Sequence, residues 1–539
     1  MRKWLLALSI AGLLAVVGIC NLLPGEAGMD IQVISQEKAR KIEQKLSEQS
    51  EETEFELKFA GEALAYDLSG KTFFLPLSMD SNEWENGSFE GADGTEVLFA
   101  EDFTREDKLS LLAQNRAIPF YAVSKEGCAK YYLKLTGLPV MAFWGTEHVT
   151  ENGEALFDMA LYDTGHDADW VTRTLTTSAL RGNTSLSYEK KSLRLKLKEQ
   201  AEDGSFKKEN KNLLGIRKDD DWILNSLYAD NSRIRDKLAM DLWQEVGAYQ
   251  NPYGRNFGVT GEYVEVIINE AYAGLYLLTH PVDGKQIGTD KVSVQLQSGQ
   301  DVVERIYKKK YSAAWRSEDF IGDLPDPNMP NYRGGFYLKG DVVLANEEEW
   351  QPLYRMALCM EEGDEAFKTQ IGQLADVKNI VENWLFFQAI AGFDNENKNV
   401  YYVSKQKGTQ SCGYFIPWDM NISFGALYAE NEFFCMESDK ELRTLVAFEP
   451  GMRVIRLDAG GARETAEQTW DKWRSSAFET GRVLAHMDEL YMQVTGSGAM
   501  AREMERWPNG NAEEDITFMK EFTTKRLAFV DEYIKQLSE

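Results

Sequence analysis

Short runs of alternating apolar and polar residues fill the chain from residue 55 to residue 340, and turn residues separate them. The clearest case is the pair 263–268 and 274–278 around the turn 269–271, which predicts a β-hairpin. Residues 190–197 form another alternating run, made of lysine, arginine, serine and leucine. This part of the chain is therefore expected to be rich in β-strands. The polar, proline-containing stretch 297–331 predicts an insertion loop.

Apolar residues dominate longer segments in the C-terminal part of the chain. Residues 374–390 are strongly apolar and predict a buried helix. One helix, 234–246, interrupts the β-rich part; the polar residues 230–232 cap its start, and Gly247 ends it. Further helices are predicted at 463–492 and 511–537. A β-rich part followed by a helical part indicates an α+β fold with two lobes and a cleft between them.

The N-terminus carries an export pattern. Arg2 and Lys3 precede the uncharged apolar run 4–23, which is typical of a signal peptide or of a single membrane anchor. Either alternative places most of the chain outside the cell, as an exported or membrane-anchored protein. The predicted divisions are a signal or anchor at 1–28, a polar stalk at 29–54, a small β-rich module at 55–130 and a larger domain at 131–539.

Charge and composition exclude several classes of protein. The chain has 539 residues and a formal net charge of −28, which repels nucleic-acid phosphates and anionic lipid. Nucleic acid is therefore not an expected partner, and the membrane is one only through an uncleaved N-terminal segment. The four histidines are scattered, so a His-based metal site or a Ser-His-Asp triad has little support. The cysteines outside the leader do not have the spacing of metal ligands. Disulfides and free thiols are the two alternatives for them.

Two acidic loops are the strongest candidates for chemistry. Asp394 and Asn399 follow the apolar helix with four residues between them, and Asp419 follows the next two strand-like runs. Protein kinases space a catalytic Asp and a metal-binding Asn in this way, and a metal-binding Asp follows them in the chain. The alternative is a helix C-terminal loop in which these residues only cap the backbone.

The basic run 190–197 stands out in an acidic chain. Alternation predicts Lys190, Ser192, Arg194 and Lys196 on one face, and Lys191 with the leucines on the other. Lys191 could then point into a cleft and bind phosphates. Solvated edge-strand lysines that prevent aggregation are the alternative.

Five ordered motifs resemble one family. The segment Arg181-Gly182-Asn183-Thr184-Ser185, followed by Lys190-Lys191-Ser192-Leu193-Arg194-Leu195-Lys196-Leu197, is similar to the RGN-x-S…KKS-x-R-x-K signature of the CotH spore-coat kinase-like family. The other matching segments are 222–239, 269–278, Asp394 to Asn399, and Pro417-Trp418-Asp419 with Phe424-Gly425. The resemblance covers about residues 135 to 430.

The resemblance implies an atypical protein-kinase-like fold with two lobes, and phosphorylation of secreted, surface or spore-coat proteins. It assigns ATP and Mg²⁺ or Mn²⁺ as cofactors. Asp394 maps to the catalytic aspartate, and Asn399 and Asp419 map to the metal-binding residues. Lys190 or Lys191 would contact the nucleotide phosphates, which the turn formed by Arg181, Gly182 and Asn183 would cover.

Three departures from the family pattern leave an alternative open. Asn421 stands where the family often has a second aspartate, His280 where an acidic residue often follows the strand, and Glu270 where the hairpin often has glycine. The alternative is a non-catalytic surface or coat protein with a kinase-like fold. A glycoside-hydrolase pair formed by Asp394 and Asp419 would leave the basic strand without a role.

Overall fold

A computed structural model of the chain describes residues 28–538, apart from 47–54, 126, 147–148, 151–152, 165–169, 248–257, 288–301, 312–313, 324–325, 327, 340–346, 397, 408–409, 430–431 and 437. It divides into two compact units. The first comprises Met1–Val140, Tyr162–Thr172 and Gly496–Gly498, and the second comprises Met141–Leu161, Arg173–Thr495 and Ala499–Glu539. The predicted domain start at residue 131 falls inside β9 (Cys128–Thr136). Residues 1–27 of the predicted export segment lie outside the described residues, and no described helix is long and apolar enough to cross a membrane.

The first unit is built on two sheets, with strand orders β1-β6-β2-β3 and β4-β5-β9-β8-β7. Stacked and edge-on aromatic rings fill its core; Phe55 and Tyr131, for example, stack at 5.0 Å between ring centroids. Such rings supply large apolar areas to a small unit. Its elements are β1 (Met29–Asp30), α2 (Gln36–Leu46), β2 (Leu57–Phe59), β3 (Glu62–Ala63), β4 (Ala65–Asp67), β5 (Thr72–Pro76), β6 (Gly87–Gly91), β7 (Glu96–Phe99), α3 (Lys108–Ala113), β8 (Ala117–Val123) and β9.

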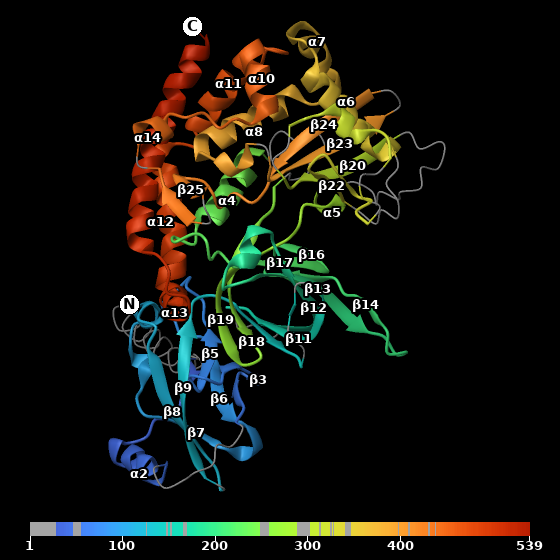
Figure 1. Cartoon of the computed structure of the whole chain (residues 1–539). Helices are drawn as coiled ribbons and strands as arrows, with labels where there is room; N and C mark the ends of the chain where they lie inside the picture. The colour runs from blue at the N-terminus through green and yellow to red at the C-terminus, as the bar shows by residue number, and fades with distance from the viewer. Residues whose placement is uncertain are drawn as a thin grey trace, which may run out of the picture. The chain divides into compact units, whose positions relative to one another are not determined.

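A sheet that closes into a barrel lies mainly within the second unit (Figure 1). Its described strands run in the order β12-β11-β10-β18-β19-β17-β13, and β12 also pairs with β13, which closes the ring; β14 extends from β13. The predicted hairpin is confirmed as β18 and β19. The strand bounds are β10 (Val140–Trp144), β11 (Ala155–Tyr162), β12 (Val171–Arg181), β13 (Ser192–Gln200), β14 (Phe206–Lys208), β17 (Asp221–Asn225), β18 (Gly261–Ile268) and β19 (Ala271–Thr279), with the separate hairpin β15 (Lys211–Leu213) and β16 (Arg217–Asp219).

A five-stranded sheet follows the barrel in the chain, with the order β21-β22-β20-β23-β24. Its central strand, β20 (Val302–Lys309), lies inside the stretch predicted as an insertion loop, so that prediction was wrong there. The inward positions of this strand include Arg305, which is buried and pairs with Glu349 at 2.5 Å. A charged inward residue hides the alternation that normally reveals a strand. The other strands are β21 (Tyr332–Arg333), β22 (Phe336–Leu338), β23 (Val400–Lys407), β24 (Gln410–Pro417) and the hairpin β25 (Ala426–Ala429) and β26 (Glu432–Cys435).

Helices make up most of the rest of the second unit (Figure 1). The buried helix predicted at 374–390 is confirmed as α8, but it begins at Val377: Leu374 is the last residue of α7, and Asp376 caps α8 by accepting a hydrogen bond from Asn379 N at 3.0 Å. Helix α8 is buried along most of its length and packs against α10, α11, α14 and β24. The helix bounds are α4 (Arg235–Gly247), α5 (Gly284–Ile287), α6 (Glu347–Glu361), α7 (Asp364–Leu374), α8 (Val377–Ile390), α9 (Asp439–Leu442), α10 (Glu449–Leu457), α11 (Ala462–Arg474), α12 (Thr480–Gly496), α13 (Ala499–Arg506) and α14 (Ala512–Ser538). The predicted α+β class is confirmed.

Glu382 on α8 should make stability depend on pH. Its side chain is 3% exposed, and burial raises its pKa from 4.5 to about 8. Because the folded state holds this proton at pH values where the unfolded state has lost it, the stabilisation is complete below pH 4.5 and disappears as pH rises through 8. Relative to Glu382→Gln, the wild-type protein should lose about 3–5 kcal/mol of unfolding free energy between pH 4 and pH 9.

Urea unfolding at a series of pH values measures this difference. Glu365→Gln is the control, because that side chain is 91% exposed. Parallel pH profiles for the wild-type protein and Glu382→Gln would contradict the prediction.

Candidate functional site

A cavity of about 470 Å³ in the second unit collects most of the residues that the sequence singled out. Its lining includes the end of β12 with the following turn, and residues 225–229 at and after the end of β17. It also includes residues of β20 and β22 and of the loops that follow α8 and β24. The predicted residues on its surface are Arg181, Gly182, Asn183, Asp394, Asn399 and Asp419. Segments far apart in the sequence therefore meet at one place.

Asp394 lies in the loop that ends α8. Ala391 ends the helix in the left-handed conformation, with φ of 53°, and the chain turns toward the cavity. Asp394 Oδ2 accepts a hydrogen bond from Asn399 Nδ2 at 2.6 Å, and its Oδ1 pairs with Lys398 Nζ at 2.7 Å. Burial raises the pKa of Asp394, the bond from Lys398 opposes that shift, and the charge of Asp419 adds to it. The carboxylate is thus oriented by two donors from its own loop.

Asn399 and Asp419 are held together by strand pairing. Asn399 precedes β23 and Asp419 follows β24 by two residues, and these strands are antiparallel partners. Trp418 N donates to Asn399 O at 3.0 Å, and Asn395 Nδ2 donates to both Asn399 O and Trp418 O. Asn399 and Asp419 each have φ of 56°. Non-glycine residues with positive φ are uncommon and often lie at functional sites, where surrounding contacts hold them in place.

Residues at the start of α4 form hydrogen bonds with the turn that follows Asp419. Buried Asp236 accepts hydrogen bonds from Met420 N at 3.1 Å and from Asn225 Nδ2 at 2.8 Å. Burial, together with the charge of Asp419, raises the pKa of Asp236 to about 7. Sequence reasoning missed Asp236, although its place in the first turn of a predicted helix, one residue after Arg235, was a signal. Arg235 Nε donates to Ser423 O at 3.1 Å and so fixes the same loop.

The turn after β12 brings a cation to the cavity. The Arg181 guanidinium lies 5.9 Å from the centre of the Trp418 ring. Burial lowers the pKa of Arg181, and the charge of Asp419 opposes that effect. Gly182 has φ of 123°, and a Cβ there would lie 1.8 Å from Ser185 Oγ, so the tight turn requires glycine.

Lys190 and Lys191 do not line this cavity. Strand β13 begins only at Ser192, so strand alternation does not apply to the two lysines, and the predicted faces were wrong for them. Lys190 is 1% exposed and pairs with Glu503 at 2.8 Å, and Lys191 Nζ donates to Leu186 O at 2.5 Å. A nucleotide contact for either lysine stays a prediction.

Four lysines that the sequence did not single out as site residues line the cavity instead: Lys308, Lys310, Lys339 and Lys398. Burial, and then the charge of Arg181, lower the pKa of Lys308 to about 7. Burial also lowers the pKa of Lys339, with Asp221 and Asp283 acting against it. Cations therefore outnumber carboxylates among the described residues of the lining, as suits an anionic ligand.

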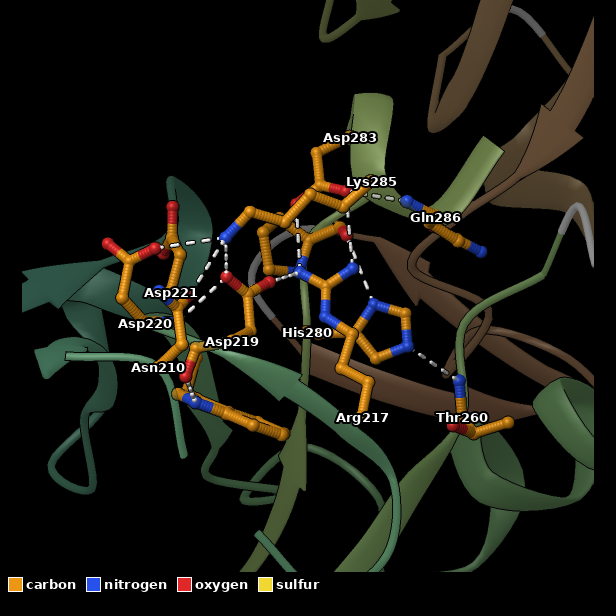
Figure 2. Close-up of polar contacts among 12 residues, drawn as sticks. Asn210, Arg217, Asp219, Asp220, Asp221, Thr260, His280, Asp283, Lys285 and Gln286 are labelled. Atoms are coloured by element: carbon orange, nitrogen blue, oxygen red, sulfur yellow. Dashed lines mark hydrogen bonds and ion pairs between the residues drawn. The ribbon is translucent and has the colours of Figure 1, made fainter. Parts of the chain in front are cut away.

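His280 follows the last residue of β19, and Figure 2 shows its ring between Arg217 and Thr260. Its Nδ1 lies 3.1 Å from Pro281 O and its Nε2 lies 3.5 Å from Thr260 N, which requires one donating and one accepting nitrogen. Burial, and then the charge of Arg217, lower the pKa of His280 to about 4. A histidine at this position therefore carries no charge at neutral pH.

The network beside His280 in Figure 2 joins β16 to α5 through ion pairs. Arg217 pairs with both Asp219 and Asp283, and Lys285 pairs with both Asp219 and Asp220. Each of these carboxylates has a cationic partner. The network therefore links residues 217–220 to residues 283–285, which follow β19.

Comparison with known proteins assigns the chain to a family. No curated protein matches the chain. The family model described as CotH kinase protein matches residues 179–530, which include every residue of the cavity lining. Because this match covers more than half of the 539 residues and contains the motifs noted in the sequence, the chain belongs to the CotH kinase protein family.

Proposed function

We propose that this protein transfers the γ-phosphoryl group of ATP to serine or threonine hydroxyls of a protein, with Mg²⁺ or Mn²⁺ as cofactor. The main support is the lining of one cavity by Asp394, Asn399 and Asp419 together with the turn 181–183. Phosphoryl transfer needs positioned groups and neutralised charge more than it needs covalent chemistry. The kinase-like description of the family agrees with this set of residues.

We further propose that the barrel and the helical part act as the two lobes of an atypical kinase-like fold. The cavity lining supports this, because it draws Arg181 and residues 225–229 from the barrel side, and Asp394 and Asp419 from the loops after α8 and β24.

The donor set fits a hard divalent cation. No described group of three or more His, Cys, Asp or Glu side chains could hold a metal alone. The cavity offers the carboxylate of Asp419 and the amide of Asn399, whose nitrogen is directed at Asp394. Mg²⁺ is commonly bound by one or two carboxylates together with substrate phosphates, so this small set is sufficient. When bound, the cation would neutralise the phosphate charge.

Asp394 would hold the acceptor hydroxyl and take its proton. Its two hydrogen-bond donors, Lys398 and Asn399, fix its orientation, and its raised pKa brings it nearer to neutral pH, which favours proton acceptance. Asn399 and Asp419 would hold the cation, and the 181–183 turn would cover the phosphates.

We propose an exported or surface protein as the acceptor, outside the cell, on the basis of the N-terminal segment Arg2 to Leu23 and of the net charge of −28. An acidic enzyme attracts basic acceptors and repels nucleic acid.

Asp394→Asn should lower phosphoryl transfer about 10²–10⁴-fold while ATP binding persists, because the amide keeps the shape and loses the proton-accepting charge. Incorporation of labelled phosphate from ATP into a basic, serine-rich protein, with Mn²⁺ present, measures the effect. Glu396→Gln is the matched control: it lies in the same loop, accepts a hydrogen bond from Ala447 N and does not line the cavity. Full transfer by Asp394→Asn would contradict the role of this residue.

A non-catalytic surface or coat protein is the second candidate, and Asn421 favours it. This residue lines the cavity and carries an amide where the family pattern often has a second carboxylate. Under this candidate, the wild-type protein shows no transfer and no thermal shift with millimolar ATP and Mn²⁺.

A further inference from the structure

Among the described lysines of the cavity, Lys308 is the one whose ammonium group lies over the ring of Trp418, the residue before Asp419. Its Nζ lies 5.2 Å from the centre of the Trp418 ring and 5.8 Å from that of the Tyr401 ring. The ammonium group of Lys308 forms no ion pair or hydrogen bond with any residue that the structure describes. Lys310 lies over the Tyr311 and Tyr337 rings instead, Lys339 is influenced by Asp221 and Asp283, and Lys398 pairs with Asp394 at 2.7 Å.

Strand register explains why Lys308 faces the cavity. In β20 it lies opposite Tyr401 of β23 and Tyr337 of β22. Its neighbour Lys309 must point to the other face, and its Nζ lies 4.9 Å from the centre of the Trp315 ring. Accordingly, Lys308 lines the cavity and Lys309 does not.

The charges around Lys308 favour an anion. Arg181 shares the Trp418 ring with it, and the charge of Arg181 disfavours the charge of Lys308. Asp419 is the carboxylate that opposes this repulsion. A cation bound at Asp419 would weaken the attraction between Asp419 and Lys308. Phosphate oxygens would then supply the missing negative charge.

We propose that Lys308, together with Arg181, binds the polyphosphate group of the nucleotide. This inference rests on the proposed function. It moves the role expected of Lys190 or Lys191 to a strand that lies after the barrel in the chain. The buried ammonium group of Lys190 already donates hydrogen bonds to Glu503 and to Leu275 O.

Binding measurements on the full chain test this role. Lys308→Met should weaken binding of Mn²⁺-ATP, and of inorganic tripolyphosphate with Mn²⁺, about 10- to 100-fold, and it should leave adenosine binding unchanged. Lys308→Arg should retain most of the affinity. Without ligand, Lys308→Met should melt at the wild-type temperature or above, because an unpaired ammonium group is removed from a mostly buried place.

Lys309→Met is the matched control, since it removes the adjacent lysine from the opposite face of the same strand. It should bind both polyphosphates as the wild-type protein does. Wild-type affinity of Lys308→Met for both would overturn the inference while leaving the proposed function standing. Failure of the wild-type protein to bind Mn²⁺-ATP, with tripolyphosphate bound and lost in Lys308→Met, would instead overturn the proposed function and support an anion site at Lys308.

Discussion

Asp419→Asn should reduce metal-dependent phosphoryl transfer about a thousand-fold or more. Asparagine tolerates the left-handed backbone that Asp419 adopts, with φ of 56°, so the turn should persist. What is lost is the charge that would hold the cation beside Asn399. Transfer of labelled phosphate measures the rate, and titration with Mn²⁺ measures the weakened metal affinity.

Asp458→Asn provides the control for this change. Asp458 is also left-handed, with φ of 52°, but it ends α10 and does not line the cavity. Its variant should transfer phosphate at the wild-type rate. Undiminished transfer by Asp419→Asn would contradict the assignment of the metal site.

Glu503→Gln should lower the free energy of unfolding by about 3–5 kcal/mol, the cost of leaving buried charge without its partner. Glu503 is fully buried on α13, with Lys190 Nζ 2.8 Å and Arg233 Nε 3.2 Å from its Oε1. It also accepts a hydrogen bond from Leu275 N at 2.8 Å. Replacing the carboxylate leaves the two cations uncompensated in a dry place. Urea unfolding monitored by circular dichroism measures the loss.

Glu505→Gln on the same helix is the control, because its side chain is exposed and its loss should cost about 0.5 kcal/mol or less. The double variant Lys190→Met with Glu503→Gln should be more stable than the sum of the two single changes predicts. Additive effects would show that the two side chains act independently.

The local patterns of the sequence predicted much of the fold. The hairpin of β18 and β19, the helix α4 and the loops that carry Asp394 and Asp419 follow from alternation, caps and turn residues within short windows. Their meeting in one cavity could be expected only from the family resemblance, because the spacing of Asp394 and Asn399 alone also fits a capping loop.

Long-range contacts explain why the sequence did not reveal strand β20, the cavity position of Lys308 or the burial of Lys190. Strand β20 carries Arg305 and Lys309 on its buried face, and their partners come from Glu349 and from aromatic rings that no local pattern reveals. Lys308 was therefore not recognised as a cavity residue. Likewise, the burial of Lys190 depends on Glu503, which follows 313 residues later.

The pairing of Lys190 with Glu503 also constrains the order of synthesis. When the barrel strands leave the ribosome, Lys190 has no carboxylate to receive its charge until residue 503 has been made. Arg235 has Asp230 as an early partner at 2.6 Å, but its second carboxylate, Asp515, also comes late. Contacts so distant in sequence form late and slow folding. The growing chain would therefore lack these buried ion pairs until residues 503 and 515 have been added.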